Sequence, residues 1–389
     1  MTADAVGGVW TYATSLGARL VRAGHQVVLA VMGPPPDASQ RADARAAGVE
    51  LRVGHYLLEW QYEPWDDVAK AGTWLLELER ELAPDVVHLN GFAHGALPFR
   101  APKLVVAHSC VASWWQAVHG ESTPASKDRY LRETARGLAG ADVVVAPSRS
   151  MLEALRLHYG VPGAARVIHN GLPAPRAAAK ERPREPIVLC AGRLDDLAKN
   201  VGCAVEAAAG LPWPMVFAGT APTAPSRGVT WLGRVPRSEL LAWFERTSIF
   251  VAPARYEPFG LVALEAALAG CALVLGDIPS LRELWGGAAV FIDPDSPRAL
   301  RDALTRLAEN EPLRQALSRR AQQRARRYSM WRMAAEYTRI YHALAGIGAA
   351  ATSPSRPPAH ERSSCESSFS AIPSAATGIT ATRTSFAES

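Results

Sequence analysis

Short apolar runs alternate with longer amphipathic stretches along the first half of the chain. Runs rich in Val, Leu and Ala lie at 27–31, 86–89, 104–107 and 143–146. Short runs rich in β-branched residues, separated by helices, are typical of parallel strands. The stretches 66–82 and 128–138 space their apolar residues as an amphipathic helix does. The pattern predicts parallel strands joined by crossover helices.

A second series of the same kind follows in the second half. Its predicted strands lie at 187–191, 215–218, 229–232, 249–252, 273–275 and 290–292. We therefore expect an α/β fold with two doubly wound, Rossmann-like domains that face a central cleft. The predicted parts are an N-terminal domain at 1–172, a linker at 173–186, a C-terminal domain at 187–330, a helix at 331–346 that packs toward the N-terminal domain, and a disordered tail at 347–389.

The beginning of the chain departs from this pattern. A doubly wound domain opens with an apolar strand that leads into its first glycine turn, yet Gly7 and Gly8 follow only Met1 to Val6. We expect the first strand to be missing; the alternative is that the domain is built differently. The apolar stripe of a first helix comes directly afterwards, at Val9, Tyr12, Ala13, Leu16 and Leu20.

Composition and charge narrow the functional classes. The 389 residues are 48% hydrophobic and 20% charged, with a mean hydropathy of −0.02, as in a globular protein that folds in water. A net charge of +5 favours anionic ligands but is too thinly spread to predict nucleic-acid binding. No apolar segment reaches the length of a membrane span, so we expect a cytoplasmic protein with at most peripheral membrane contact. The cysteines have no metal-ligand spacing and are expected to be reduced: Cys110, Cys190, Cys203, Cys271 and Cys365.

The strongest candidate motif is the segment Arg-Tyr-Glu-Pro-Phe-Gly-Leu-Val-Ala-Leu-Glu at 255–265. In it a strand ends, a Pro/Gly turn follows, and a helix begins near Gly260. A helix N-terminus offers unpaired N–H groups and a positive dipole end to an anion, so we predict that a diphosphate binds there. Glu257 lies at the strand's carboxyl end, and Glu265 lies in an apolar helix where ribose hydroxyls could be its partner. The alternative is that Glu257 caps the helix and Glu265 pairs with a buried arginine.

A second motif, Gly-Arg-Leu-Asp-Asp-Leu-Ala-Lys-Asn at 192–200, directly follows a predicted strand. Arg193 and Lys199 would therefore lie at the carboxyl end of the same sheet and could neutralise a departing diphosphate. Taken alone, this segment is better explained by a solvated loop with a surface ion pair to Asp195 or Asp196. The two motifs gain weight together, because they meet at one edge of one sheet.

The sequence resembles the GT-B family 4 of retaining glycosyltransferases. The resemblance rests on the Gly7-Gly8 pair, on Arg193 with Lys199, and on the spacing of Glu257 and Glu265, and it covers roughly residues 4–345. It implies a nucleotide-diphosphate sugar as donor, with Glu257 at the sugar and Glu265 at the ribose. Further donor-side residues that the resemblance implies are Gly8, Phe259, Gly260 and Leu261.

The same resemblance implies that Arg193 and Lys199 hold the phosphates and that His108, in Val-Val-Ala-His-Ser, lies close to the donor sugar. A lone histidine at a strand end is otherwise more often structural. It also implies that the hexosyl group is transferred with retention of configuration. Polysaccharide or glycoconjugate synthesis is the expected setting.

No Asp-x-Asp motif appears on a suitable strand end, so we predict that no metal or other cofactor is needed. The expected partners are the nucleotide sugar and a glycan, lipid-linked or small-molecule acceptor. Aromatic residues in turn-like stretches could stack on the acceptor or simply pack: Trp60, Tyr62, Trp65, Trp114, Trp115 and His119.

The sequence alone leaves two other functions open. One is a catalytically silent, two-lobed binding subunit of the same architecture, and the other is a GT-B nucleotide-sugar epimerase. Retention of Glu257, Arg193 and Lys199 together argues against the silent subunit. A pyridoxal-type phosphorylase would need a cofactor lysine and a longer chain.

Overall fold

The computed structural model describes residues 1–161, 163–173, 184–220 and 229–346. Most of the segment predicted as a linker, and all of the segment predicted as a disordered tail, lie outside the described residues. The first strand after the linker begins at Glu185, inside the range assigned to the linker.

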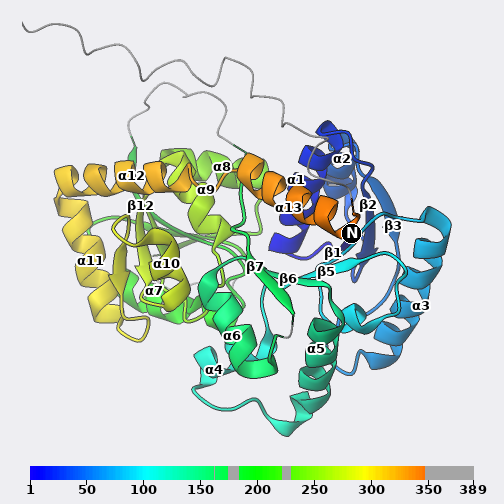
Figure 1. Ribbon diagram of the computed structural model, residues 1–389. Helices are drawn as coiled ribbons and strands as arrows, with labels where there is room; N and C mark the ends of the chain where they lie inside the picture. Colours follow the sequence, from blue (N-terminus) through cyan, green and yellow to red (C-terminus); the bar gives the residue numbers. More distant parts are fainter. Residues whose placement is uncertain (162, 174–183, 221–228, 347–389) are drawn as a thin grey trace, which may run out of the picture. The chain divides into compact units, whose positions relative to one another are not determined.

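The C-terminal half is built on one parallel sheet of six strands (Figure 1). They are β8 (Glu185–Ala191), β9 (Met215–Ala218), β10 (Val229–Gly233), β11 (Thr247–Ala252), β12 (Ala272–Gly276) and β13 (Val290–Ile292). Their order is β10-β9-β8-β11-β12-β13, so the winding reverses between β8 and β11. In open α/β sheets, ligands bind outside the carboxyl ends of the strands at such a reversal.

Helices cover both faces of this sheet. They are α7 (Val201–Ala208), α8 (Arg237–Arg246), α9 (Leu261–Ala269), α10 (Pro279–Trp285), α11 (Pro297–Glu309) and α12 (Glu311–Ala325). Alternate strand residues point to opposite faces: Phe250 lies in the core beneath α9 and α10, while Val251 lies in the core beneath α7 and α11. The chain thus leaves β8 toward one face and β11 toward the other.

The N-terminal half contains two parallel sheets, in the orders β1-β2-β3 and β4-β5-β6-β7. The strands are β1 (Thr2–Asp4), β2 (Val28–Met32), β3 (Glu50–Val53), β4 (Val87–Leu89), β5 (Lys103–Val106), β6 (Val143–Ala146) and β7 (Ala164–Val167). The expectation that the first strand is missing is wrong, because Thr2–Asp4 pairs in parallel with Ala30–Met32. Three residues are too short a run to be recognised by apolar patterning.

Asn90 joins these two sheets. Its backbone N–H donates to Thr2 Oγ1 at 2.8 Å and its Nδ2 donates to the Thr2 carbonyl at 2.7 Å. Both bonds lie where β1 and β4 run side by side. The N-terminal half therefore has its own reversal of winding, between β1 and β4. The prediction of two doubly wound α/β units is confirmed.

Some helices of the N-terminal half begin at a residue whose side chain caps them. Ser148 Oγ, for example, accepts the N–H of Met151 at 3.2 Å and begins α6. Helical elements here are α1 (Gly8–Arg22), α2 (Ala38–Ala46), α3 (Trp65–Leu82), η1 (Ala93–Ala96), α4 (Val111–His119), η2 (Ala125–Lys127), α5 (Asp128–Gly140) and α6 (Arg149–Tyr159).

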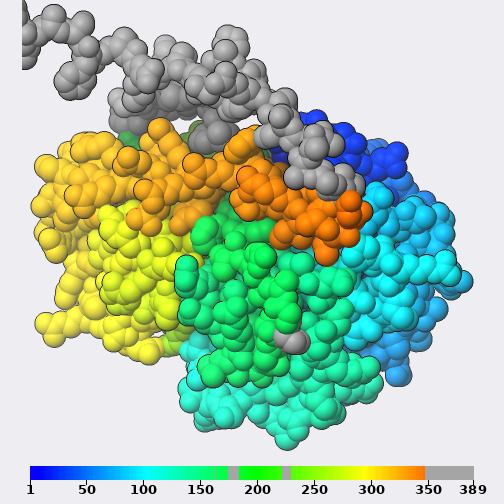
Figure 2. Space-filling model, in the orientation of Figure 1, coloured from blue at the N-terminus to red at the C-terminus, as the bar shows by residue number. Residues whose placement is uncertain are grey.

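The final helix, α13 (Met330–Leu344), packs on the N-terminal half, and in Figure 2 its orange surface borders the blue N-terminal residues. Met333 and Tyr337 lie in one core with Leu16 of α1. Just before α13, the chain runs beside the segment by which it first left the N-terminal half. There, Leu172 N–H donates to the Tyr328 carbonyl at 3.1 Å. Gly171 is needed where these segments meet, because a Cβ there would overlap the backbone of Ser329.

Glycine is also required where α5 meets the loop after β4. A Cβ at Gly137 would overlap the carbonyl of Phe92, which is backbone and cannot rotate away. We predict that Gly137→Ala lowers the free energy of unfolding by roughly 1–3 kcal/mol or more, as overpacking does. Urea unfolding followed by circular dichroism measures it.

The matched control is Gly202→Ala in α7, which is exposed and has no atom within 4 Å of an added Cβ. It should raise stability by about 0.5–1 kcal/mol through helix propensity alone. Equal effects of the two substitutions would contradict the packing at Gly137.

Candidate active site

The residues of both predicted motifs meet at the reversal between β8 and β11. Arg193 follows β8, and Lys199 ends the short helix η3 (Leu197–Lys199) in the same loop. Glu257 lies in the loop after β11, and Gly260 is the residue before α9. Both loops leave the carboxyl ends of adjacent strands, which brings two cations and a carboxylate to one edge of the sheet.

Glu257 occupies the centre of this group. Its Oε2 lies 2.7 Å from Lys199 Nζ, in an ion pair whose two side chains are each 23% exposed. Its Oε1 accepts the backbone N–H of Gly260 at 2.8 Å. The capping alternative for Glu257 is thus the arrangement observed in this structure, with Lys199 as an additional partner. Ser280 Oγ donates to the Glu257 carbonyl at 2.6 Å and ties down the backbone beside it.

The start of α9 depends on Gly260. Its φ of 82° lies in the left-handed region that a residue with a Cβ rarely adopts. Phe259 is 3% exposed, and its ring packs edge-on against Tyr328 with centroids 5.6 Å apart. Phe259 therefore anchors the loop in the core. Leu261 is half-buried and faces the N-terminal half of the chain, where a Cβ on Gly8 would lie 3.6 Å from its Cδ1.

The glycine pair lies against both motifs. A Cβ on Gly7 would be 3.6 Å from Arg193 Cδ, and Gly7 itself has a φ of 73°. Arg193 Nη2 forms an exposed ion pair with Asp196 Oδ2 at 3.0 Å, as the solvated-loop alternative expected. Burial raises the pKa of Asp4, at the end of β1, to about 6, and the positive charge of Arg193 opposes this rise.

Glu265 is buried in α9 and pairs with Arg237 Nη2 at 2.6 Å. Burial raises the pKa of Glu265, and Arg237 opposes the rise. The alternative of an arginine partner is observed, although the Arg237 side chain is 47% exposed rather than buried. Arg237 also donates to Thr11 Oγ1 of α1 at 3.2 Å.

Three contacts that the sequence did not reveal hold the N-terminal half against this site. Cys110 N–H donates to the Tyr256 hydroxyl at 3.0 Å, and Ser148 Oγ donates to the Pro258 carbonyl at 2.8 Å. The Glu283 carboxylate of α10 accepts the first N–H groups of α6, from Arg149 at 2.8 Å and Ser150 at 2.9 Å. No local pattern could reveal these partners, because in each pair they lie more than a hundred residues apart. Ser148 alone could be recognised from the sequence, as a helix cap.

His108 lies two residues from Cys110 in the loop after β5 and is half-buried. Its Nε2 is 2.8 Å from Asn90 Oδ1, and its ring packs edge-on against Tyr12 with centroids 4.5 Å apart. Burial lowers the pKa of His108 to about 4, so the ring is neutral near pH 7.

The aromatic residues separate into packed and exposed groups. Trp114 Nε1 donates to Asp196 Oδ1 at 2.9 Å, and Trp115 packs on His119 with centroids 4.3 Å apart. Trp65 lies beneath the guanidinium of Arg129. Trp60 and Tyr62 are 48% and 88% exposed in the loop before α3.

An Asp-x-Asp pattern occurs as Asp293-Pro294-Asp295, directly after β13. β13 is the edge strand, two strands from β11, and Asp295 is paired with Arg255 at 2.7 Å. Across the described residues, no three His, Cys, Asp or Glu side chains gather as a metal site would require. Nor does that part of the chain include a helix with the length and apolar character of a membrane crossing.

Comparison with known proteins identifies relatives over most of the chain. Residues 6–175 match the model of "Glycosyltransferase Family 4", and residues 174–324 match that of "Glycosyl transferases group 1". A glycogen synthase of Mycobacterium tuberculosis is 29% identical over 326 residues, which cover 72% of this chain and 76% of the relative.

Solved structures with the same fold extend this result. Sucrose-phosphate synthase from Thermosynechococcus elongatus is 20% identical with a TM-score of 0.71, covering 89% of this chain and 96% of that one. HepE from Anabaena, solved in complex with UDP-glucose, is 15% identical with a TM-score of 0.71, covering 88% and 100%. At such identities these structures establish the fold, and the two family models establish the sequence relationship. The chain belongs to the group 1 glycosyltransferases of the GT-B type.

Proposed function

We propose that this glycosyltransferase moves a hexosyl group from a nucleoside-diphosphate donor to a hydroxyl group of an acceptor, with retention of configuration and without a metal ion. One observation carries the proposal. Arg193, Lys199, Glu257 and the N-terminus of α9 converge at the strand reversal, with the Gly7-Gly8 turn against them. The UDP and UDP-glucose complexes of HepE, a protein of the same fold, support this class of donor.

The donor diphosphate would replace carboxylates of the protein as the partner of both cations. In this structure, Lys199 is paired with Glu257 and Arg193 with Asp196. A diphosphate at the start of α9 would offer both cations a doubly negative partner and would accept N–H groups from the helix terminus. Gly7 and Gly8 leave room beside it, since neither carries a Cβ.

Glu265 would bind the ribose hydroxyls of the donor. Its pair with Arg237 holds the carboxylate in place within an otherwise apolar helix, so its oxygens are already positioned to accept hydrogen bonds. A ribose that donates its hydroxyls to Glu265 would displace or share Arg237, which also contacts Thr11. The donor's nucleoside would therefore lie between α8, α9 and α1.

Chemistry in this proposal needs no protein nucleophile. The acceptor hydroxyl attacks the anomeric carbon on the face from which the diphosphate departs. The bond between that carbon and the phosphate oxygen breaks, and the phosphate oxygen keeps the electron pair and takes the acceptor's proton. Negative charge grows on the β-phosphate as this bond breaks, and Arg193, Lys199 and the helix dipole stabilise it.

A glycan is the acceptor class that we favour. The glycogen synthase relative supports transfer of glucose to a polysaccharide, and the exposed rings of Trp60 and Tyr62 offer apolar faces for sugar stacking. Lipid-linked and small-molecule acceptors are the other classes to be assayed, and contact with a membrane surface would be peripheral.

Removal of either phosphate cation should slow catalysis. We predict that Arg193→Ala and Lys199→Ala each lower kcat by about a hundredfold, because a fixed cation stabilises the transition state more than the bound donor. Steady-state kinetics with a panel of nucleotide sugars measures it.

Arg246→Ala is the matched control for those two variants. Arg246 forms an exposed pair with Glu185 at the other end of the same sheet, so its loss should leave kcat unchanged. Near-normal kcat in folded Arg193→Ala and Lys199→Ala proteins would contradict the phosphate role. A wild-type protein that binds the donor but neither transfers nor hydrolyses it would be a silent binding subunit, and one that only inverts a sugar carbon would be an epimerase.

Loss of the buried carboxylate should act on binding. We predict that Glu265→Gln raises KM for the donor by about tenfold, as loss of a hydrogen bond to a charged group does, with little change in kcat. The exposed Glu245→Gln on α8 serves as control. A fall in kcat at unchanged KM would place Glu265 at the reacting bond instead.

Chelation should not stop the reaction. We predict that the rate of transfer is the same with and without excess EDTA, since side-chain cations and a helix N-terminus neutralise the leaving group. Initial rates measured after dialysis against EDTA decide this. A rate that collapses and returns with Mg²⁺ or Mn²⁺ would overturn the proposal of a metal-independent enzyme.

A further inference from the structure

The amide of Asn90 has its orientation set by the junction between the two N-terminal sheets. Its Nδ2 donates to the Thr2 carbonyl at 2.7 Å, a partner that can only accept. Nδ2 must therefore be the end that faces Thr2, and the carbonyl oxygen Oδ1 must face the opposite way. The Asn90 backbone is held as well, because its N–H donates to Thr2 Oγ1.

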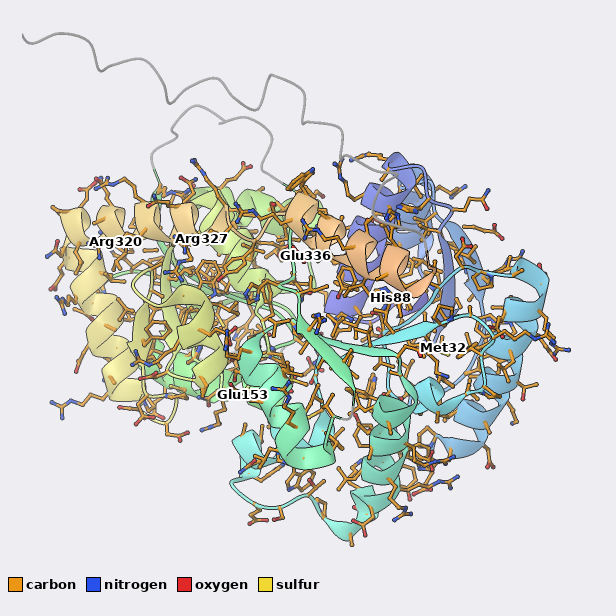
Figure 3. All side chains as sticks on the ribbon, viewed as in Figure 1. Met32, His88, Glu153, Arg320, Arg327 and Glu336 are labelled. Carbon is orange, nitrogen blue, oxygen red and sulfur yellow. The ribbon has the colours of Figure 1, made fainter. Side chains whose placement is uncertain are left out.

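Two imidazole rings share the Asn90 oxygen. His108 Nε2 lies 2.8 Å from Oδ1, and His88 Nε2 lies 3.1 Å from it. A carbonyl oxygen only accepts hydrogen bonds, so both rings must carry a proton on Nε2. His88 completes the pattern, because its Nδ1 then accepts the hydroxyl of Tyr341 on α13 at 2.7 Å. Figure 3 labels His88 beside this helix.

The remaining nitrogen of His108 is left with a lone pair. Burial lowers the pKa of His108 to about 4, so the ring carries one proton at neutral pH. That proton is on Nε2, where it is donated to Asn90 Oδ1. Among the described residues, no group bonds to His108 Nδ1. The His108 loop also adjoins the donor motif, since Cys110 N–H donates to Tyr256, the neighbour of Glu257.

We propose that Asn90 is a positioning residue that holds His108 in the Nε2–H tautomer, so that Nδ1 is presented to the substrate as a hydrogen-bond acceptor. The group that it accepts is a hydroxyl of the transferred sugar. This second part rests on the proposed function. The tautomer itself does not, because it follows from the contacts of the free protein.

A purely structural role for Asn90 predicts something different. If Asn90 only joins β1 to β4, its loss would lower stability and leave the chemistry of His108 untouched. Tautomer state and energetic coupling separate the two roles, because joining two strands affects neither.

The first measurement is the tautomer of His108, by long-range ¹H–¹⁵N correlation NMR on the histidine-labelled full-length protein near pH 7. His108→Gln assigns the signal by its loss. The expected result is a single neutral tautomer with the proton on Nε2 in the wild type, and a mixture of tautomers in Asn90→Leu. A proton on Nδ1 in the wild type would overturn the proposal, even if Asn90→Leu does not fold.

The second measurement is a double-mutant cycle on kcat. Asn90→Leu should lower kcat about tenfold in the wild type, and by no more than about twofold in the His108→Gln background, since the two residues act as one unit. Asn310→Leu, which removes a cap of α12, is the control for lost stability and should leave kcat unchanged. Equal losses in both backgrounds would show that Asn90 does not act through His108. An inactive wild type that has the Nε2–H tautomer would contradict the proposed function but not the tautomer.

Discussion

In the C-terminal sheet, the chain leaves β8 toward α7 on one face and leaves β11 toward α9 on the other. Two neighbouring loops must therefore diverge, and space opens between the carboxyl ends of these strands. The charges expected at the donor phosphates and sugar depend on that divergence, because Arg193 and Lys199 lie on the first loop and Glu257 on the second. The N-terminal half repeats the arrangement at β1 and β4, where Asn90 follows β4 and contacts His108 from the loop after β5.

Each of these cations is paired with a carboxylate of the same chain. Lys199 is matched by Glu257, Arg193 by Asp196 and Arg237 by Glu265. Each carboxylate holds a cation in place, so the cations are ordered before a ligand arrives and less entropy is lost when it binds. An incoming anion then competes with a carboxylate rather than with water alone. Selectivity for a doubly charged diphosphate over a weaker anion follows from that competition.

Residues near strand ends could be predicted, because the apolar run of the strand marks its end in the sequence. The strands β9 and β13 begin and end where their apolar runs do, and Arg193, Lys199 and Glu257 follow such runs directly. The edge strands β3 and β7 were missed because exposed positions interrupt their apolar pattern. Asn90 could not be found, since its partners Thr2 and His108 lie 88 and 18 residues away. Long-range pairing leaves no signature in one sequence.

The packing of α13 has a consequence for synthesis on the ribosome. Met333 and Tyr337 complete the core that also holds α1 and β2, yet they are among the last described residues to be translated. Domains generally fold in the order in which they emerge. Here the strands from β8 to β13 form one contiguous stretch and can close their sheet first, while the N-terminal core keeps an open side. Until α13 emerges, the apolar surface around Leu16 that this helix covers stays exposed on the nascent chain.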